Sequence, residues 1–273
     1  MKKVLVYFLA VSFTLFSSFP LLWMFVCSLK PYNEIYSLPV TILPKSISLE
    51  NYETLFRDIP FSTFVVNSFI IAGCTTLICI GLASLGAYGL TRFKFPGRDL
   101  IARLTLVTYM VSPVTLVIPL YLLLVVPLHL ADTHLGLVMV YVTISLPLCL
   151  WLVRAFFLGV PMELDEAAMV DGATRLQALV YIVLPQAVPG IIAASIISLT
   201  WCLDEYLYAL IIIDTVSNKT YPIGIGSLAI LSFELRWDYL LSAGVIITAI
   251  LLIVFAFAQR WLIKGWGAGA VKG

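Results

Sequence analysis

The sequence predicts an all-α membrane protein with six transmembrane helices and both chain ends on the cytoplasmic side. Of its 273 residues, 62% are hydrophobic and only 11% are charged, whereas a soluble domain carries about 25% charged residues. Six apolar segments are long enough to cross a bilayer, and Lys and Arg are divided unequally between the loops that join them. No basic run is long enough to follow a phosphate backbone, so nucleic acid is not an expected partner.

The apolar segments are expected to be helices. A bilayer core about 30 Å thick needs ~20 apolar residues in a helix, and no segment alternates with the period of a barrel strand. The first segment is longer than the apolar part of a secretion signal and no small-residue cleavage site follows it, so we expect it to be retained. The six segments cover roughly residues 4–29, 62–90, 101–126, 134–158, 183–213 and 239–263.

Proline and glycine recur within these segments. In a membrane bundle, proline marks kinks and glycine marks close contacts between helices. The prolines are Pro20, Pro113, Pro119, Pro147, Pro185 and Pro189, and the glycines of the second segment include Gly81, Gly86 and Gly89.

The positions of Lys and Arg set the orientation, because cytoplasmic loops carry an excess of them. With the N-terminus inside, eleven lie on the inner side and five on the outer side, which places both ends inside. The inner ones are Lys2, Lys3, Arg92, Lys94, Arg98, Arg103, Arg154, Arg175, Arg260, Lys264 and Lys272, and the outer ones are Lys30, Lys45, Arg57, Lys219 and Arg236.

This topology defines the expected domain organisation. Residues 1–273 form a single transmembrane domain with an inner loop at about 159–182 and a cytoplasmic tail at 264–273. Two outer loops, at about 30–61 and 214–238, carry most of the acidic residues found outside the inner loop. These outer loops are either simple connectors or a surface that meets a soluble partner.

The inner loop has the signals of two short helices joined by a tight turn. Pro161 fits the first position of a helix, and the acidic residues Glu163, Asp165 and Glu166 then fall in the first turn, where negative charge complements the helix dipole. A turn is predicted at 171–172, where Asp is followed by Gly.

The second short helix is predicted to begin at Thr174, because Thr174 and Gln177 have the spacing of a capping box. In the first helix, residues four apart share a face. Ala167 and Asp171 therefore share one face, and Ala168 and Gly172 share another. The small residues on these faces would let another backbone approach closely. The alternative is a solvated connector helix, since alanine also favours helix formation.

One motif ties this loop to a known family. Glu166-Ala167-Ala168-x-x-Asp171-Gly172-Ala173, followed by Ile182-x-Leu184-Pro185, resembles the EAA loop of ABC importer permeases at nine positions of fixed spacing. The resemblance covers nearly the whole chain and points to the carbohydrate-uptake branch, in particular to permeases of the smaller maltose-transporter type. Further matching runs are 87–88, 92–93, 95–98, 118–121, 132–133, 136–137 and 269–273.

The resemblance implies a type I importer permease fold and a division of labour. An external solute-binding protein delivers a sugar or sugar-like solute, and this chain and a distinct sister permease form the pathway. Two separate ATPase subunits bind ATP and magnesium. The residues implied to contact the ATPase are Glu166, Ala167, Ala168, Asp171, Gly172 and Ala173.

The same resemblance implies a multi-pass subunit in the plasma (inner) membrane of a bacterium or archaeon. No G-x-x-x-x-G-K-[ST] run is present in the sequence, so we expect a non-catalytic chain that holds no cofactor itself. No metal site is expected: His129 stands where relatives commonly have glycine and is interpreted as a loop substitution, and His134 is not interpreted as a ligand. The five cysteines are interpreted as small apolar residues within helices.

Two carboxylates, Asp204 and Glu205, lie inside the fifth apolar segment. A charge at mid-bilayer costs roughly 2.5–3.5 kcal/mol, so such residues normally face the bundle interior or water. Adjacent residues of a helix point about 100° apart. We therefore expect one of them to contribute to the translocation path or its gate and the other to contact a neighbouring helix.

The aromatic residues Trp201 and Tyr206 are candidates for the same path, where they would stack on sugar rings. Aromatic residues also gather at membrane interfaces, which is the alternative. Relatives usually have Trp-Asn-Glu/Asp-Phe here, whereas this chain has Leu203-Asp204-Glu205-Tyr206. Because of this difference the identity of the solute is not carried over.

Two other classes of function remain open. A proton-coupled secondary transporter would use Asp204 or Glu205 as its proton carrier, as membrane carboxylates often do. An integral-membrane enzyme would need a nucleophile with its base, or a cluster of metal ligands, and the sequence suggests neither.

Overall fold

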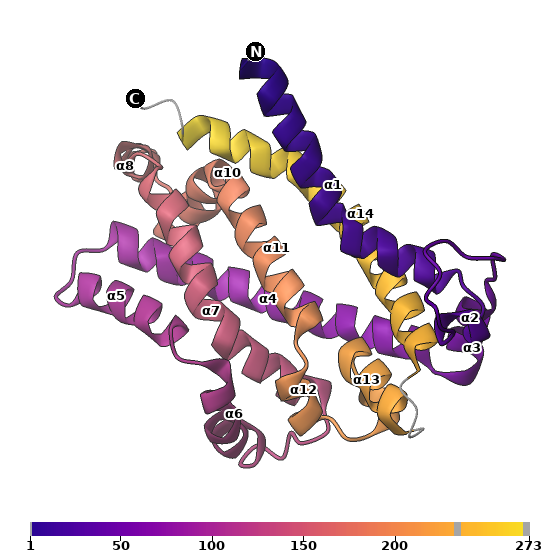
Figure 1. The fold of residues 1–273 in the computed structure, drawn as a ribbon. Coiled ribbons are helices and arrows are strands. Elements are labelled where there is room, and N and C mark those ends of the chain that lie inside the picture. The colour runs from indigo at the N-terminus through magenta and orange to yellow at the C-terminus, as the bar shows by residue number, and fades with distance from the viewer. Residues whose placement is uncertain (1, 232–235, 270–273) are drawn as a thin grey trace. The chain divides into compact units, whose positions relative to one another are not determined.

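The structure is a computed structural model that describes residues 2–231 and 236–269, and within these ranges every regular element is helical (Figure 1). The chain forms two compact units. One consists of Met1–Ser62 with Gly224–Leu252 and the other of Thr63–Ile223 with Ile253–Gly273. Residues 270–273 of the predicted cytoplasmic tail, including Lys272, lie outside the described part.

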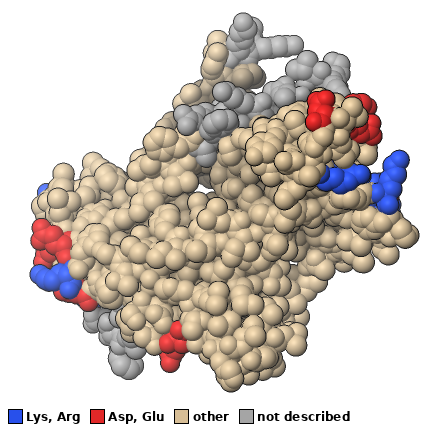
Figure 2. Space-filling model, turned by 180° about the vertical axis from the view of Figure 1, so that it is seen from behind, with Lys and Arg blue, Asp and Glu red and all other residues tan. Residues whose placement is uncertain are grey.

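Four helices are long and apolar enough to cross a membrane: α1 (Lys2–Ser28), α4 (Phe61–Arg92), α7 (His134–Leu158) and α14 (Trp237–Gly269). Two bent pairs bring the number of spans to six if each pair counts as one. This confirms an all-helical fold of the expected kind. The surface in Figure 2 is mainly uncharged, as expected for a protein that faces lipid.

The third predicted segment is not one straight helix. It consists of α5 (Arg98–Tyr109), α6 (Pro113–Leu120) and a π-helical turn, η1 (Tyr121–Val125), and the axis bends by 98° between α5 and the rest. Pro113 begins α6 directly after the bend. Proline fits a helix start because its missing N–H would be unpaired there in any case, so this kink is at a predicted position.

The fifth segment also departs from the prediction of a single helix over 183–213. It begins with α9 (Arg175–Ala178), η2 (Leu179–Val183) and α10 (Leu184–Gln186), bends by 81°, and continues as α11 (Val188–Asp204). Pro185 and Pro189 lie on either side of the bend. After a break at 205–206 the chain forms α12 (Leu207–Ile212), so Glu205 and Tyr206 are not in a continuous helix.

Proline alone does not bend a helix here, since Pro20 lies within α1 and Pro147 within α7. The outer loops contain short helices as well: α2 (Tyr32–Ile35), α3 (Glu50–Asp58), the 3₁₀ turn η3 (Val216–Asn218) and α13 (Tyr221–Leu231). The last helix was expected to end near 263, and α14 instead continues to Gly269.

In the larger unit, α7 packs against α5 and α11. Its core contains small residues of α4 together with side chains of α7 and η2, including Ala83, Val153 and Val183, which are fully buried. A Cβ at Gly190 would lie 2.1 Å from Phe156 Cγ, so α11 approaches α7 closely at this glycine.

The close contacts predicted for the glycines of α4 are only partly present. A Cβ at Gly86 would lie 2.9 Å from Leu150 Cδ1, as expected for a close contact. At Gly81 and Gly89 a Cβ would meet no described atom within 4 Å, so the prediction was wrong for these two. Neither glycine faces a neighbouring helix closely enough to need its small size.

In the smaller unit, hydrogen bonds tie the first outer loop to the end of α1. Asn51 on α3 donates its Nδ2 to the carbonyl oxygens of Ser28, at 2.9 Å, and Lys30, at 2.8 Å. The Ser28 carbonyl is one of those that the end of α1 leaves without a helical partner, and the Lys30 carbonyl belongs to the loop that follows. The Lys30 ammonium lies 5.0 Å from the centre of the Trp23 ring.

Candidate functional site

The inner loop folds as two short helices joined by a turn, as the sequence predicted. The first helix is α8 (Met162–Val170), and Pro161 is its N-cap and not its first helical residue, one position from the prediction. Glu163 and Asp165 lie in the first turn. Glu166 falls just beyond that turn, because the helix begins one residue later than expected.

Local hydrogen bonds define the turn after α8. Gly172 N–H donates to the Met169 carbonyl at 3.1 Å, and Ala173 N–H donates to the Ala168 carbonyl at 2.9 Å. These two bonds form a Schellman motif, which needs a residue with positive φ just after the helix. Gly172 has φ of +93°, which glycine adopts without strain. The turn predicted from Asp171-Gly172 is confirmed.

The capping box predicted at the second helix is also present. Gln177 N–H donates to Thr174 Oγ1 at 3.3 Å, and Thr174 N–H donates to Gln177 Oε1 at 2.7 Å. The helix α9 starts at Arg175 and continues into the π turn η2. The loop therefore has a defined shape that is set by its own sequence.

The helix α8 presents one face outward. Glu163, Glu166, Ala167 and Val170 are exposed, and the spacing of these residues places them on one side of the helix. Val170 is 87% exposed. The outward face of α8 therefore combines carboxylates with a small and a large apolar side chain.

The six predicted coupling residues divide between this face and its edge. Glu166, Ala167, Asp171 and Gly172 are exposed, whereas Ala168 and Ala173 are half-buried. Ala167 and Ala168 are adjacent in α8 and point about 100° apart, so the two alanines do not share one face. Glu166 forms no ion pair within the described ranges.

The inner face of α8 holds a buried ion pair that sequence reasoning missed. Asp165 Oδ2 accepts a hydrogen bond from Arg92 Nε at 2.5 Å, and the two side chains are only 3% and 5% exposed. Arg92 also donates its Nη2 to the Val160 carbonyl at 2.9 Å. Arg92 is the last residue of α4, so this pair attaches the inner loop to a transmembrane helix.

A signal for this contact was present in the sequence. Asp165, Ala168 and Met169 are spaced by three and four residues, and they form the less exposed side of α8. Burial of a carboxylate is costly unless it is paired, and Arg92 supplies the opposite charge here. A second contact supports the same junction, since the Arg175 guanidinium lies 5.0 Å from the centre of the Phe93 ring.

The two carboxylates of the fifth segment have different surroundings. Glu205 accepts hydrogen bonds from the N–H groups of Tyr208, at 2.8 Å, and Ala209, at 3.1 Å. It therefore caps α12, and it also accepts a hydrogen bond from the Tyr141 hydroxyl of α7 at 2.7 Å. Asp204 is exposed and accepts a long hydrogen bond of 3.4 Å from the Tyr221 hydroxyl.

The two aromatic candidates lie near these carboxylates. Trp201 packs edge-on against Tyr141, with ring centres 5.4 Å apart, and it lines an apolar cavity of about 550 Å³ together with Tyr109 and Pro147. Tyr206 is 38% exposed at the break before α12. Trp201 is therefore connected to Glu205 through Tyr141.

An outer hydrogen-bond network centres on Asp132. Its carboxylate accepts from the N–H groups of Asp214 and Thr215, both at 3.0 Å, and from the Thr215 hydroxyl at 2.5 Å. These hydrogen bonds lower the pKa of the Asp132 carboxyl, and the bond from the Thr215 hydroxyl contributes most. The ring of His134 contacts the Asn218 carbonyl at 3.1 Å.

His129 has φ of +52°, in the left-handed region. Glycine is the residue that adopts this conformation most readily. This gives a backbone reason for the glycine that the family resemblance implies at this position, and His129 lies in the loop between η1 and α7.

The described part of the chain is a helical protein with several helices apolar enough to cross a membrane, and a buried ion pair joins the end of α4 to the loop helix α8. Residues 78–267 match the family described as the binding-protein-dependent transport system inner membrane component. The chain belongs to this family. Relatives are described as ABC transporter permeases, and the chain is accordingly a membrane component of such a system.

Proteins of similar sequence match this chain over nearly its whole length. The inner membrane ABC transporter permease protein YcjP of Escherichia coli is 32% identical over 263 residues, covering 96% of this chain and 93% of that protein. The sulfoquinovosyl glycerol transport system permease protein SmoH of Agrobacterium fabrum is 34% identical over 97% of this chain and 93% of its own length. The trehalose/maltose transport system permease protein MalG of Thermococcus litoralis is 32% identical over 100% and 98%.

A solved structure has the same fold. It belongs to a bacterial ABC transporter involved in the import of the acidic polysaccharide alginate, and one of its chains superposes with a TM-score of 0.80 at 19% identity, over 94% of this chain and 95% of that chain. The importer permease fold expected from the sequence is confirmed.

Proposed function

We propose that this chain is one of two permease subunits of an importer for a sugar or sugar-like solute, and that the outward face of α8 binds a separate ATPase subunit. The observation that carries the proposal is the exposed face formed by Glu166, Ala167 and Val170. The other side of α8 is attached to the end of α4 by the buried ion pair of Arg92 and Asp165. Movement of a bound ATPase would thus be transmitted to α4.

The family description and the relatives support the remaining parts of this proposal. A binding-protein-dependent system needs an external binding protein, and the outer loops 30–61 and 214–238 are the surfaces that would meet it. A distinct sister permease would complete the pathway. ATP and magnesium would be bound by two ATPase subunits, and the system would work in the plasma (inner) membrane of a bacterium or archaeon.

The sugar class is supported by what the relatives are described as transporting. They include permeases for trehalose and for diacetylchitobiose. In this chain, Asp204, Tyr206 and Trp201 are the candidate path residues, with Asp204 exposed and Glu205 engaged as a helix cap. We therefore assign the path or gate role to Asp204, and Glu205 to the support of α12.

Replacing Glu166 by alanine tests the docking surface. The variant Glu166→Ala is co-expressed with the sister permease and the ATPase, and the amount of ATPase that co-purifies is measured. Loss of a buried interfacial charge pair costs roughly 2–5 kcal/mol, so we expect about 30-fold weaker binding or more. Glu53→Ala is the matched control, because Glu53 is an exposed glutamate on the outer helix α3.

Unchanged ATPase recovery with Glu166→Ala would contradict the docking proposal. The source of energy is tested separately in membrane vesicles. Uptake driven by ATP should continue when a proton ionophore is added. Collapse of uptake with the ionophore would favour a proton-coupled secondary transporter that uses Asp204 or Glu205.

A further inference from the structure

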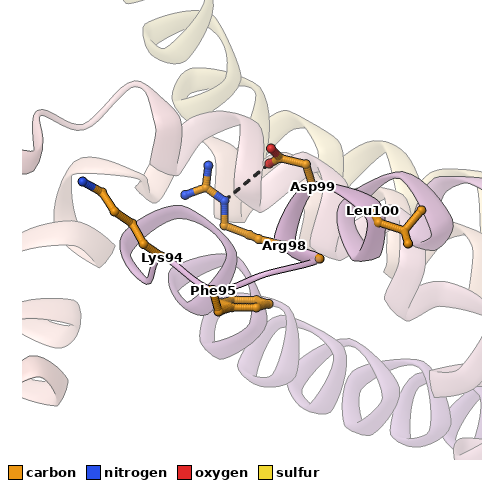
Figure 3. Close-up of a pocket in the computed structure, with 6 residues that line it drawn as sticks. Lys94, Phe95, Arg98, Asp99 and Leu100 are labelled. Carbon is orange, nitrogen blue, oxygen red and sulfur yellow. Dashed lines mark hydrogen bonds and ion pairs between the residues drawn. The ribbon is translucent and has the colours of Figure 1, made fainter.

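Two surface hollows beside α5 are lined by basic side chains. One has a volume of about 350 Å³ and lies in the loop before α5, where Lys94, Arg98 and Asp99 surround it (Figure 3). The other has a volume of about 240 Å³ and lies between α5 and α7, where Arg103, Arg154 and Trp151 line it. Asp99 lines both hollows, so they adjoin each other.

The hollows have an excess of positive charge. Lys94, Arg98, Arg103 and Arg154 face a single carboxylate, Asp99, which pairs with Arg98 at 3.4 Å. The other three form no ion pair within the described part of the chain. The Nε of Arg154 is buried and has no hydrogen-bond partner among the described residues.

Arg103 and Arg154 both line the smaller hollow, so an anion bound there would lie between two positively charged side chains. Since one liquid water occupies about 30 Å³, a hollow of 240 Å³ has room for a group of several heavy atoms such as a phosphodiester. Arginine binds phosphate oxygens with paired N–H donors.

The surface beside the hollows is apolar. Leu100, Leu104 and Val107 are 60%, 51% and 55% exposed, and their spacing of four and three residues places them on one side of α5. Trp151 is 42% exposed at the edge of the smaller hollow. Tryptophan is enriched at the level of lipid headgroups. A ligand that fits this surface has an anionic head and an apolar tail.

The distribution of Lys and Arg along the chain predicts that the hollows lie on the cytoplasmic side. Arg92 precedes the loop that forms the first hollow, and it is bound to Asp165 of the inner loop. Lys and Arg near the inner side of a membrane attract anionic lipids. The position of the hollows is therefore that of a headgroup.

We infer that the two hollows bind the phosphate headgroup of an anionic phospholipid, with an acyl chain along the apolar side of α5. Arg103 and Arg154 hold the phosphate from two helices, and Lys94 and Arg98 add attraction from the adjoining hollow. This site is separate from the face of α8 proposed to bind the ATPase. It does not depend on which solute is transported.

Native mass spectrometry of the purified full chain tests this inference. The lipids are phosphatidylglycerol and phosphatidylcholine, added at equal concentration, and inorganic phosphate is tested as a competitor. Each basic residue near an anionic surface contributes about 1 kcal/mol, which corresponds to about a fivefold change in affinity. We expect phosphatidylglycerol adducts to fall about fivefold in Arg103→Gln and about 25-fold in Arg103→Gln with Arg154→Gln.

Arg57→Gln is the matched control, because Arg57 is an exposed arginine of α3, outside the hollows. It should leave the adducts unchanged, and phosphatidylcholine adducts should not respond to any variant. The single variant at exposed Arg103 keeps the test valid if the double variant does not fold. Retention of the phosphatidylglycerol preference in Arg103→Gln would overturn the inference.

Two further outcomes would also overturn it. Equal competition by inorganic phosphate would identify a site for free anions that gains nothing from the apolar side of α5. Absence of phosphatidylglycerol from the assembled transporter, when the chain alone binds it, would show that another protein subunit covers the hollows.

Discussion

Arg92 and Asp165 join the end of a transmembrane helix to the loop helix α8 through a hydrogen bond of 2.5 Å. The two residues are 73 positions apart in sequence, and both side chains are nearly excluded from solvent. Arg92 also binds the carbonyl of Val160, just before α8. Because α8 is held at both its start and its first turn, it is expected to move together with α4.

Loss of the Asp165 charge should loosen this junction. Asp165→Asn leaves the Arg92 guanidinium buried without a counterion, and breaking a buried pair in this way costs about 3–5 kcal/mol. We expect a lower melting temperature and faster hydrogen exchange of the amides of α8. Asp171→Asn is the control, since Asp171 is exposed at the end of the same helix.

An apolar pair should restore stability without restoring charge. Replacing Arg92 by Met together with Asp165 by Leu removes both buried charges, which is often neutral or stabilising. If Asp165→Asn alone were as stable as the natural protein, the pair would not be the anchor of α8.

Gly172 is expected to tolerate a side chain poorly for a backbone reason alone. A Cβ there would meet no described atom within 4 Å, but its φ of +93° disfavours other residues. Gly172→Ala should lower stability by about 1–2 kcal/mol, measured as a shift of the thermal unfolding midpoint. Gly89→Ala should be neutral or stabilising, because Gly89 lies in a helix with open space around it.

Stability should depend on the size of the side chain at position 190 and not on a special backbone angle there. A Cβ would lie 2.1 Å from Phe156 Cγ, so Gly190→Ala forces α11 away from α7. Overpacking of this kind typically costs 1–3 kcal/mol. Phe156→Leu in the same chain should recover part of the loss, and Gly81→Ala should cause none. A loss of equal size at Gly81 would mean that the contact with Phe156 is not its cause.

Substitutions at Asp204 and at Glu205 should affect different properties of the protein, namely uptake and stability. Glu205→Ala removes the cap of α12 and the acceptor of the Tyr141 hydroxyl, so we expect a loss of stability of about 1–2 kcal/mol. Asp204→Ala changes an exposed side chain, for which stability usually shifts by less than about 0.5 kcal/mol. We expect Asp204→Ala to reduce uptake at unchanged melting temperature. Unchanged uptake would remove Asp204 from the path.

The hydrogen bonds around Asp132 predict that the local stability of this outer loop depends on pH. The Thr215 hydroxyl and neighbouring N–H groups lower the pKa of Asp132 below its ordinary value of about 3.9. A group with a lowered folded-state pKa stabilises the fold above the unfolded pKa, and this contribution is lost as pH falls through the folded pKa. Hydrogen exchange at Asp214 and Thr215 should therefore rise only below about pH 3.9.

Asp132→Asn should remove this acid response while leaving that of the rest of the chain in place. The variant should exchange faster at Thr215 already at neutral pH, because the charged acceptor is gone. An identical pH profile in both proteins would assign the response to another group.

Features that depend on neighbouring residues in sequence were largely predictable. The turn at Gly172 and the capping box of Thr174 with Gln177 are local patterns, and both are present as predicted. The apolar segments were found by length and hydropathy. Their bends of 98° and 81° were marked by proline, but proline also occurs in unbroken helices such as α7.

Contacts between segments that are distant in sequence could not be predicted from local sequence patterns. Nothing near Asp165 in sequence identifies Arg92 as its partner, because the pairing depends on how α4 meets α8. Glu205 was expected inside a helix, yet it ends up at a break, where it binds the N–H groups of the next helix. Its role follows from that break, which periodicity does not reveal.

The sequence distance between Arg92 and Asp165 has a consequence for how the protein is made. At a synthesis rate of roughly 5–20 residues per second, Arg92 leaves the ribosome about 4–15 s before its counterion. During that interval the arginine must remain in contact with water or headgroups, and it can be buried only when two more spans have been inserted. The inner loop can therefore reach its final attachment to α4 only late in synthesis, after the fourth membrane segment has been made.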